Sequence, residues 1–185
     1  MEATRPACPR PWSEIAASVP GLRPEAAWRR VCFGVVCGTH TWGHITMTTH
    51  RIGIVFNGAT GELAGRQHLP ALMAMRDEGG LPLADGSRLI PDVVLVGRDS
   101  AKLEATAAST RFLRRTTDLD TALASTSETI FFEAASSGRR TSGMLRAIAA
   151  GKHVDCEKPC AGSVADALQL QEAANPAGVK SGTVQ

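Results

Sequence analysis

A glycine-rich segment in the first half of the chain, Gly58-Ala-Thr-Gly61, has the composition of a phosphate-binding turn. Glycine reaches backbone conformations that other residues avoid, and the absence of a Cβ lets the main chain approach a pyrophosphate. A helix that begins directly after such a turn adds free N–H groups and the positive end of its dipole. We therefore predict a dinucleotide-binding turn, with these candidate contacts: Asn57, Gly58, Ala59, Thr60, Gly61 and Leu63.

The spacing of the glycines leaves a second interpretation open. Gly58 and Gly61 are followed by Ala64 and Gly65, which differs from the G-x-G-x-x-G pattern of dinucleotide-binding folds. A glycine-rich turn can also be only a tight connection between a strand and a helix, so the structural context has to decide. Glu62 suits the N-terminal end of a helix but would repel a pyrophosphate.

Arg98 and Asp99 follow the second apolar run of the chain, residues 93–96. The end of the second strand is where a dinucleotide-binding fold contacts the adenosine ribose. An acid there accepts a hydrogen bond from the 2′-hydroxyl of NAD, whereas an arginine binds the 2′-phosphate of NADP. Because Arg98 comes first, we favour NADP as the cofactor over NAD. The alternative for Arg98 is an ordinary solvent-exposed arginine.

Apolar runs and predicted helices alternate from residue 52 onwards. Strands are predicted at 52–56, 93–96, near 112–113, and at 129–132, 153–156 and 179–184; helices are predicted at 62–76, 100–109, 118–124, 139–150 and 163–174. Pro70 should kink or break the first helix unless that helix begins late. Residues 77–91 are predicted to form a loop with turns. The alternation indicates an α/β fold, a Rossmann-type doubly wound parallel sheet with helices on both faces in a single domain.

Composition excludes several classes of partner. The chain has 185 residues and a net charge of only +2, which gives no reason to expect a nucleic-acid or membrane partner. No apolar run approaches the roughly 18 residues that a membrane span requires. The five cysteines are odd in number and form no C-x-x-C pair, which favours reduced thiols in a cytoplasmic protein.

Residues 1–46 differ from the rest, because they contain all three tryptophans and many prolines. Arg29-Arg30 before an apolar run loosely resembles a twin-arginine signal, but the run is short and lies deep in the chain. Cys37, His40 and His44 lack a fourth ligand nearby, so we predict no metal site. We expect 1–46 to be a poorly ordered extension, or a leader before a start at Met47, and 47–185 to be the dinucleotide-binding domain.

The segment Ala150-Gly-Lys-His-Val-Asp-Cys-Glu-Lys-Pro159 resembles a signature of the Gfo/Idh/MocA oxidoreductases, and the resemblance extends from Arg51 to Gln185. It implies an NAD(P)-dependent enzyme that transfers hydride to or from a sugar-like or polyol-like substrate. It also implies that Lys158 lies beside the nicotinamide and acts in catalysis, with Glu157 and Pro159 shaping the turn. An ammonium there can polarise a hydroxyl or move its proton. The alternative for Lys158 is one more surface lysine.

Two departures from the family pattern affect what the resemblance implies. Many members carry Thr-Pro or Asn-Pro after the strand that corresponds to 129–132, and a histidine follows. Here Ala135-Ser136-Ser137-Gly138 forms the turn and Arg140 takes the place of the histidine; Ser136 stays a candidate cofactor contact. Members also continue into a second α/β domain with substrate contacts and the oligomer interface. The chain ends at Gln185, so we expect a fragment that is inactive alone and forms no oligomer.

Two other functions stay open. Gly-Ala-Thr-Gly also resembles the turn of extended short-chain reductases, some of which only sense nucleotide, so a stand-alone NADP-sensing module is possible. The Glu157-Lys158-Pro159 strand end and the absence of tyrosine disfavour that module. The third interpretation is a non-functional gene remnant, in which an exposed sheet edge would favour aggregation.

Overall fold

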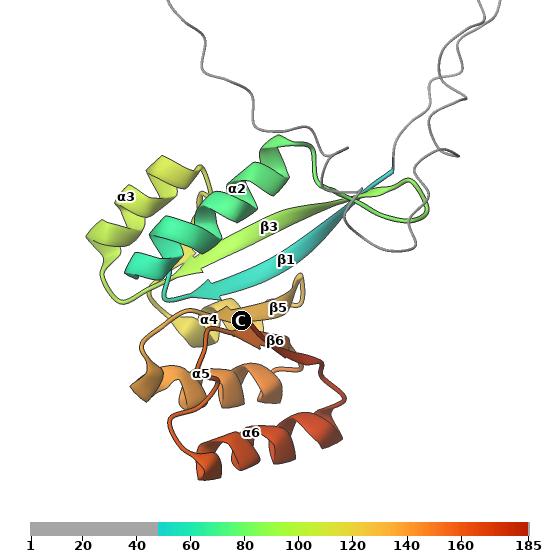
Figure 1. Ribbon diagram of the computed structural model, residues 1–185. Coiled ribbons are helices and arrows are strands. Elements are labelled where there is room, and N and C mark those ends of the chain that lie inside the picture. The colour runs from blue at the N-terminus through green and yellow to red at the C-terminus, as the bar shows by residue number, and fades with distance from the viewer. Residues whose placement is uncertain (1–47, 185) are drawn as a thin grey trace, which may run out of the picture. The chain divides into compact units, whose positions relative to one another are not determined.

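The computed structural model describes residues 48–184 (Figure 1). The extension, signal and metal ligands considered at residues 1–46 lie outside the described residues. The strands are β1 Thr49–Asn57, β2 Leu81–Pro82, β3 Arg88–Val96, β4 Arg114–Thr116, β5 Glu128–Glu133, β6 His153–Cys156 and β7 Ser181–Thr183. The helices are α2 Leu69–Asp77, α3 Ser100–Thr110, α4 Leu119–Ala124, α5 Ser137–Ala149 and α6 Val164–Ala177, and a π-helical turn, η2 Ala64–His68, precedes α2.

The strands form one seven-stranded sheet in the order β2-β3-β1-β5-β6-β7, and β4 also pairs with β3. All pairs are parallel except β2 with β3. The chain moves from β1 to β3 on one side, and later returns to β5 on the other side of β1. This reversal is the point at which doubly wound sheets open a crevice beyond the strand ends. The predicted Rossmann fold is confirmed.

Helices cover both faces of the sheet, with α2 and α3 on one face and α4, α5 and α6 on the other (Figure 1). Successive residues of β1 therefore enter two different cores. Ile54 and Phe56 pack with the α2 and α3 side, whereas Val55 packs with the α4, α5 and α6 side. Burial on both faces explains why the strand is an unbroken apolar run instead of an alternating one.

Pro70 does not break the first helix, because a π-helical turn precedes it. The N–H of Leu69 donates to the carbonyl of Ala64, five residues back. Pro70 then occupies the first turn of α2, where its missing N–H leaves no hydrogen bond unmade. The helical path from Glu62 to Asp77 is thus continuous but changes its hydrogen-bond spacing at η2.

Several boundaries differ from the sequence prediction, among them those of β3 and β4. Residues 88–91 were predicted as loop but form the first part of β3, where Leu81 and Pro82 pair antiparallel with Leu89 and Arg88. The turn signals of residues 77–87 belong to this small hairpin. The strand expected near 112–113 begins two residues later as β4, and Phe112 instead packs into the core beside α3. Within residues 48–184 no helix is both long and apolar enough to cross a membrane.

Candidate functional site

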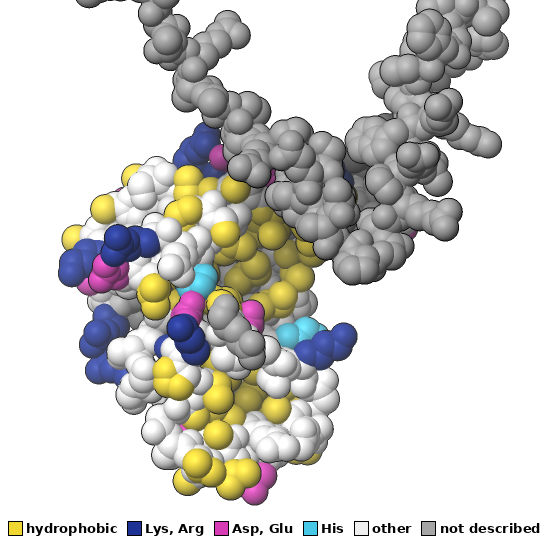
Figure 2. All heavy atoms as spheres, in the orientation of Figure 1, with side chains coloured by type: hydrophobic (Ala, Val, Ile, Leu, Met, Phe, Trp, Pro, Cys, Tyr) yellow, Lys and Arg dark blue, Asp and Glu magenta, His cyan; other side chains and the backbone are white. Residues whose placement is uncertain are grey.

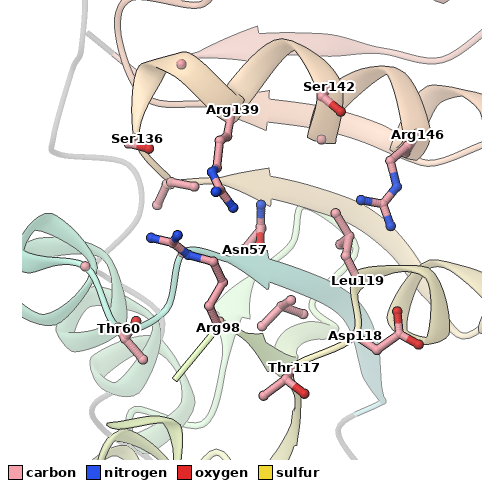
Figure 3. Close-up of a pocket in the computed structure, with 18 of the residues that line it drawn as sticks. Asn57, Thr60, Arg98, Thr117, Asp118, Leu119, Ser136, Arg139, Ser142 and Arg146 are labelled. Carbon is pink, nitrogen blue, oxygen red and sulfur yellow. The ribbon is translucent and has the colours of Figure 1, made fainter. Parts of the chain in front are cut away.

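A cleft of about 810 Å³ lies at the carboxyl edge of the sheet. Its walls come from the ends of β1, β3 and β5, from residues 117–119, and from the first turns of α5 (Figure 3). The strand order reverses at this edge, so the cleft lies where a doubly wound sheet binds its ligand. Its volume falls within the roughly 300–1,000 Å³ range of small-molecule sites.

Gly58 marks the closest approach between two walls of the cleft. A Cβ built on it would lie 2.5 Å from the nitrogen of Ala135, and its φ is +81°. The N–H groups of Gly58 and Ala59 both donate to the carbonyl of Val96 at 3.0 Å. Gly58 therefore joins the ends of three strands, and these two N–H groups are already used within the protein.

The other glycines of the turn are under weaker constraint. A Cβ on Gly61 would lie 3.1 Å from the carbonyl oxygen of Gly58, and one on Gly65 would meet nothing within 4 Å. Glu62, which would repel a phosphate, forms an ion pair with Arg66 at 2.6 Å. The structure thus gives a steric reason for Gly58 and none for Gly65.

The predicted cofactor contacts fall into three groups. Ala59 is buried beneath the turn, and Leu63 is exposed and lies outside the lining. Glu157, Lys158 and Pro159 follow β6 and also lie outside the lining. Six predicted contacts line the cleft: Asn57, Gly58, Thr60, Gly61, Arg98 and Ser136.

The two charged residues after β3 have different positions. Asp99 is the N-cap of α3, and its carboxylate accepts the Lys102 N–H at 3.0 Å. Arg98 lines the cleft, and Figure 3 shows its guanidinium group inside it. The acid that could accept a ribose hydroxyl is therefore engaged by the helix, while the arginine faces the ligand space.

Several basic residues of the cleft were missed by sequence reasoning. Lys102, Arg139 and Arg146 line it together with Arg98. Arg146 is paired with Asp120. The two adjacent arginines at the start of α5 have different surroundings. Arg139 lines the cleft, whereas Arg140 is buried and donates to the carbonyls of Ala135 and Pro159. The sequence shows the Arg-Arg pair, but helical phase alone did not tell which one faces the ligand.

Lysines and arginines do not form one continuous patch on the molecular face in Figure 2, where they occupy several separate places. The basic side chains of the cleft are thus a local feature. Among residues 48–184 no group of three or more His, Cys, Asp or Glu side chains is arranged to hold a metal ion.

Glu133 is a fully buried carboxylate that does not line the cleft but contacts residues that do. It accepts hydrogen bonds from Asn57 Nδ2 at 2.9 Å and from the Ala135 N–H at 2.7 Å. A Cβ on Gly143 would lie 2.4 Å from its Oε2, so α5 can pass here only because that residue is glycine. Burial raises the pKa of Glu133, against the opposing effect of these two hydrogen bonds.

A second buried carboxylate holds the turn that carries Lys158. Glu157 Oε1 lies 2.6 Å from His68 Nε2, and its Oε2 accepts the Lys158 N–H at 3.2 Å. The Glu157 N–H donates to the carbonyl of Glu133 at 3.1 Å. The Lys158 side chain is exposed at this edge of the sheet. The ends of β5 and β6 are therefore linked by main-chain and carboxylate contacts.

Residues 51–184 match the model of the Gfo/Idh/MocA family, an oxidoreductase family with an NAD-binding Rossmann fold. A D-xylose dehydrogenase of Paenarthrobacter nicotinovorans is 34% identical over 134 residues, which are 72% of this chain and 34% of that protein. The chain thus spans about a third of this relative's length.

Solved structures agree with the sequence comparison. An NAD-binding oxidoreductase from Klebsiella pneumoniae is 28% identical with a TM-score of 0.62, over 73% of this chain and 34% of that one. The WlbA dehydrogenase from Chromobacterium violaceum, solved with NADH and UDP-GlcNAcA, is 28% identical with a TM-score of 0.58. That match covers 72% of this chain and 35% of WlbA.

Replacing Gly58 and Gly65 separately by alanine tests the steric constraint at the turn. Gly58→Ala must push Ala135 away from β1, so we expect a loss of about 2 kcal/mol or more in the free energy of unfolding. Gly65→Ala has open space in a helical segment, so we expect a gain of about 0.5–1 kcal/mol. Urea unfolding measures both, and equal effects of the two changes would contradict the constraint.

Glu133→Gln tests the buried carboxylate through its pH dependence. A raised pKa in the folded state means that the contribution of Glu133 is fully present at low pH and is lost as pH rises through that pKa. The unfolding free energy of the wild type should therefore fall relative to Glu133→Gln as pH rises from 4.5, the ordinary value, towards neutrality. Urea unfolding at a series of pH values measures this difference.

Glu128, at the other end of β5, is the matched control. Burial alone would raise its pKa, but hydrogen bonds from Ser125, Arg114 and Ser127 outweigh burial, so its pKa lies below the usual value. The contribution of Glu128 is thus present above the ordinary pKa and is lost as pH falls. The difference in unfolding free energy between the wild type and the variant should therefore change with pH in opposite directions for Glu133→Gln and Glu128→Gln. A change in the same direction for both variants would refute the assignment of the two carboxylates.

Proposed function

The chain belongs to the Gfo/Idh/MocA family of oxidoreductases, and we propose that it binds NADP or NAD for hydride transfer to or from a sugar-like alcohol or ketone. The observation that carries this proposal is the cleft over the glycine turn at the reversal point of the sheet. The named substrates and the sugar nucleotide of the relatives belong to proteins about twice as long as this chain. Their substrate class is therefore part of the proposal.

The residues present suit a dinucleotide. Gly58 has no side chain, and this lets Ala135 pack against the turn and form one wall of the cleft. Four basic side chains line the cleft and Asp118 is its only acidic lining residue among those described. The carboxylate of Asp118 is engaged as the N-cap of α4, where it accepts the Asp120 N–H at 3.0 Å.

The bound nicotinamide would supply the hydride acceptor or donor. Lys158 is the proposed catalytic residue of the chain, and its task is to hold or move the proton of the substrate hydroxyl. Its main chain is fixed to Glu157, while its side chain is exposed at the carboxyl end of β6, two strands from β1. This position lies beyond the cleft, on the side away from β3 and Arg98.

NADP is the preferred cofactor in this proposal. The support is the division of roles after β3, because Asp99 caps α3 whereas Arg98 lines the cleft. A guanidinium group binds a phosphate through paired, charge-assisted hydrogen bonds. The Asp99 carboxylate, which caps α3, would have to release the Lys102 N–H before it could accept a hydrogen bond from a ribose hydroxyl.

A second candidate is a nucleotide-binding module without catalysis. It is favoured by one observation, which is that the described residues lining the cleft all lie between Asn57 and Arg146, so Lys158 lies outside the lining. The two functions differ only in turnover, so binding and turnover have to be measured on the same protein.

Calorimetric titration of the chain with NADPH and NADH tests the cofactor assignment. We expect tighter binding of NADPH, and we expect Arg98→Ala to weaken NADPH by about 10- to 100-fold, since a hydrogen-bonded charge contributes about 1.5–3 kcal/mol. NADH should change by less than about 2-fold, because it lacks the 2′-phosphate. Tighter binding of NADH by the wild type would refute the NADP preference.

Lys158→Met tests catalysis, with Lys180→Met as a control at another exposed lysine. The readout is the absorbance of reduced nicotinamide with D-xylose, the sugar in the name of the matched dehydrogenase, as first probe. We expect Lys158→Met to lower turnover by about 10²–10⁴-fold, the usual contribution of a proton-transfer group, and to leave NADPH affinity within about 2-fold. Binding without turnover in the wild type would favour the second candidate.

A further inference from the structure

Two arginines in the cleft have no acidic partner among residues 48–184. Of the four basic residues that line it, Arg146 is paired with Asp120, and Lys102 Nζ lies 3.9 Å from Asp99. Arg98 and Arg139 form no ion pair within the described residues. They come from different elements, the end of β3 and the first turn of α5, and their guanidinium groups point toward one another in Figure 3.

Like charges that face each other repel, and an anion between them removes this cost. The glycine turn itself offers an anion fewer donors than its sequence suggests, because the N–H groups of Gly58 and Ala59 both donate to Val96. Glu62, the first acidic residue after the turn, adds repulsion that its ion pair with Arg66 only reduces. An anion bound at the turn therefore needs a positively charged side chain nearby.

Arg139 has the position to be that cation. The loop before it packs directly on the turn, since the Ala134 N–H donates to the carbonyl of Asn57 at 2.9 Å and Ala135 abuts Gly58. Arg98 comes from a different wall, the end of β3. In a doubly wound fold the diphosphate lies over the turn after the first strand, and the ribose 2′ position lies at the end of the second.

We propose that Arg139 binds the diphosphate of the cofactor from the α5 wall, opposite Arg98, which binds the 2′-phosphate. This assignment rests on the proposed function, and it gives each arginine a different phosphate group of the cofactor to bind. Arg139 then contributes equally to NADH and NADPH affinity, whereas Arg98 discriminates between them. The first turn of α5 adds its own positive dipole end to the same anion.

The test compares Arg139→Gln, Arg139→Lys and Arg98→Gln in the whole chain, with Arg51→Gln as control for the loss of one charge. Arg51 is exposed near the amino end of β1, about 20 Å from Asn57 along an extended strand. Calorimetry measures the affinity of each variant for NADH, NADPH, ADP and 2′-AMP. ADP carries the diphosphate without a 2′-phosphate, and 2′-AMP carries the 2′-phosphate without a diphosphate.

We expect Arg139→Gln to weaken NADH, NADPH and ADP by a common factor of about 10 or more, with 2′-AMP unchanged. Arg98→Gln should weaken NADPH and 2′-AMP and leave NADH and ADP unchanged. Arg139→Lys should recover part of the affinity, because it keeps the charge but loses the paired hydrogen bonds. Arg51→Gln should bind all four ligands as the wild type does.

Other outcomes separate the failures. If the wild type binds the dinucleotides and Arg139→Gln changes none of the affinities, the assignment of Arg139 is wrong while the proposed function stands. If Arg139→Gln weakens only NADPH and 2′-AMP, both arginines serve the 2′-phosphate and the diphosphate assignment is overturned. If the wild type binds no dinucleotide, the proposed function fails and this assignment fails with it. Thermal unfolding of each variant excludes misfolding as the cause.

Discussion

The contact between Gly58 and Ala135 is the constraint on which the cleft depends. It brings the end of β1 against the loop between β5 and α5, and the bonds from Gly58 and Ala59 to Val96 attach the end of β3 to the same point. Three strand ends are thereby fixed relative to each other by main-chain contacts alone. Side chains placed on these strand ends, such as Asn57 and Arg98, inherit a fixed geometry, which is the requirement for a preorganised binding site.

The buried carboxylates extend this constraint across the sheet edge. Glu133 fixes Asn57 and Ala135, and its carbonyl accepts the N–H of Glu157, whose own carboxylate is held by His68. The ring of His68 lies 4.8 Å from that of Phe132, so an aromatic core residue packs against this contact. Burying Glu133 in this way disfavours its charged form. A group that lowers stability near neutral pH is typical of sites where geometry is maintained for binding.

The sequence predicted the elements better than the site. Buried strands are visible as apolar runs, and the helices after β3, β4 and β6 begin at the capping residues Asp99, Asp118 and Ser163. These signals depend only on residues that are close in sequence, so they can be recognised without knowing the tertiary structure. The π-helical turn before Pro70 and the extension of β3 to Arg88 depend on hydrogen-bond partners that are distant in sequence or on an unusual helical spacing. No local pattern encodes them.

The lining of the cleft was predicted only where its residues are in or next to a motif. The glycine turn and Arg98 follow apolar strands and were found, whereas Arg139 lies within a helix whose sequence gives no motif. Adjacent residues explain this limit. After β3 the carboxylate of Asp99 turns to its helix while Arg98 faces the cleft, and in α5 Arg140 is buried while Arg139 faces the cleft.

In each of these two pairs, neighbours in sequence differ in direction, because successive side chains point about 100° apart on a helix and to opposite sides of an extended segment. A capping bond settles the first pair, since Asp99 cannot cap α3 and face the ligand at once. Two carbonyl acceptors settle the second, since Ala135 and Pro159 engage Arg140. The residue that the fold does not engage is the one left to line the cleft, so the cleft wall follows from the contacts that the backbone makes first.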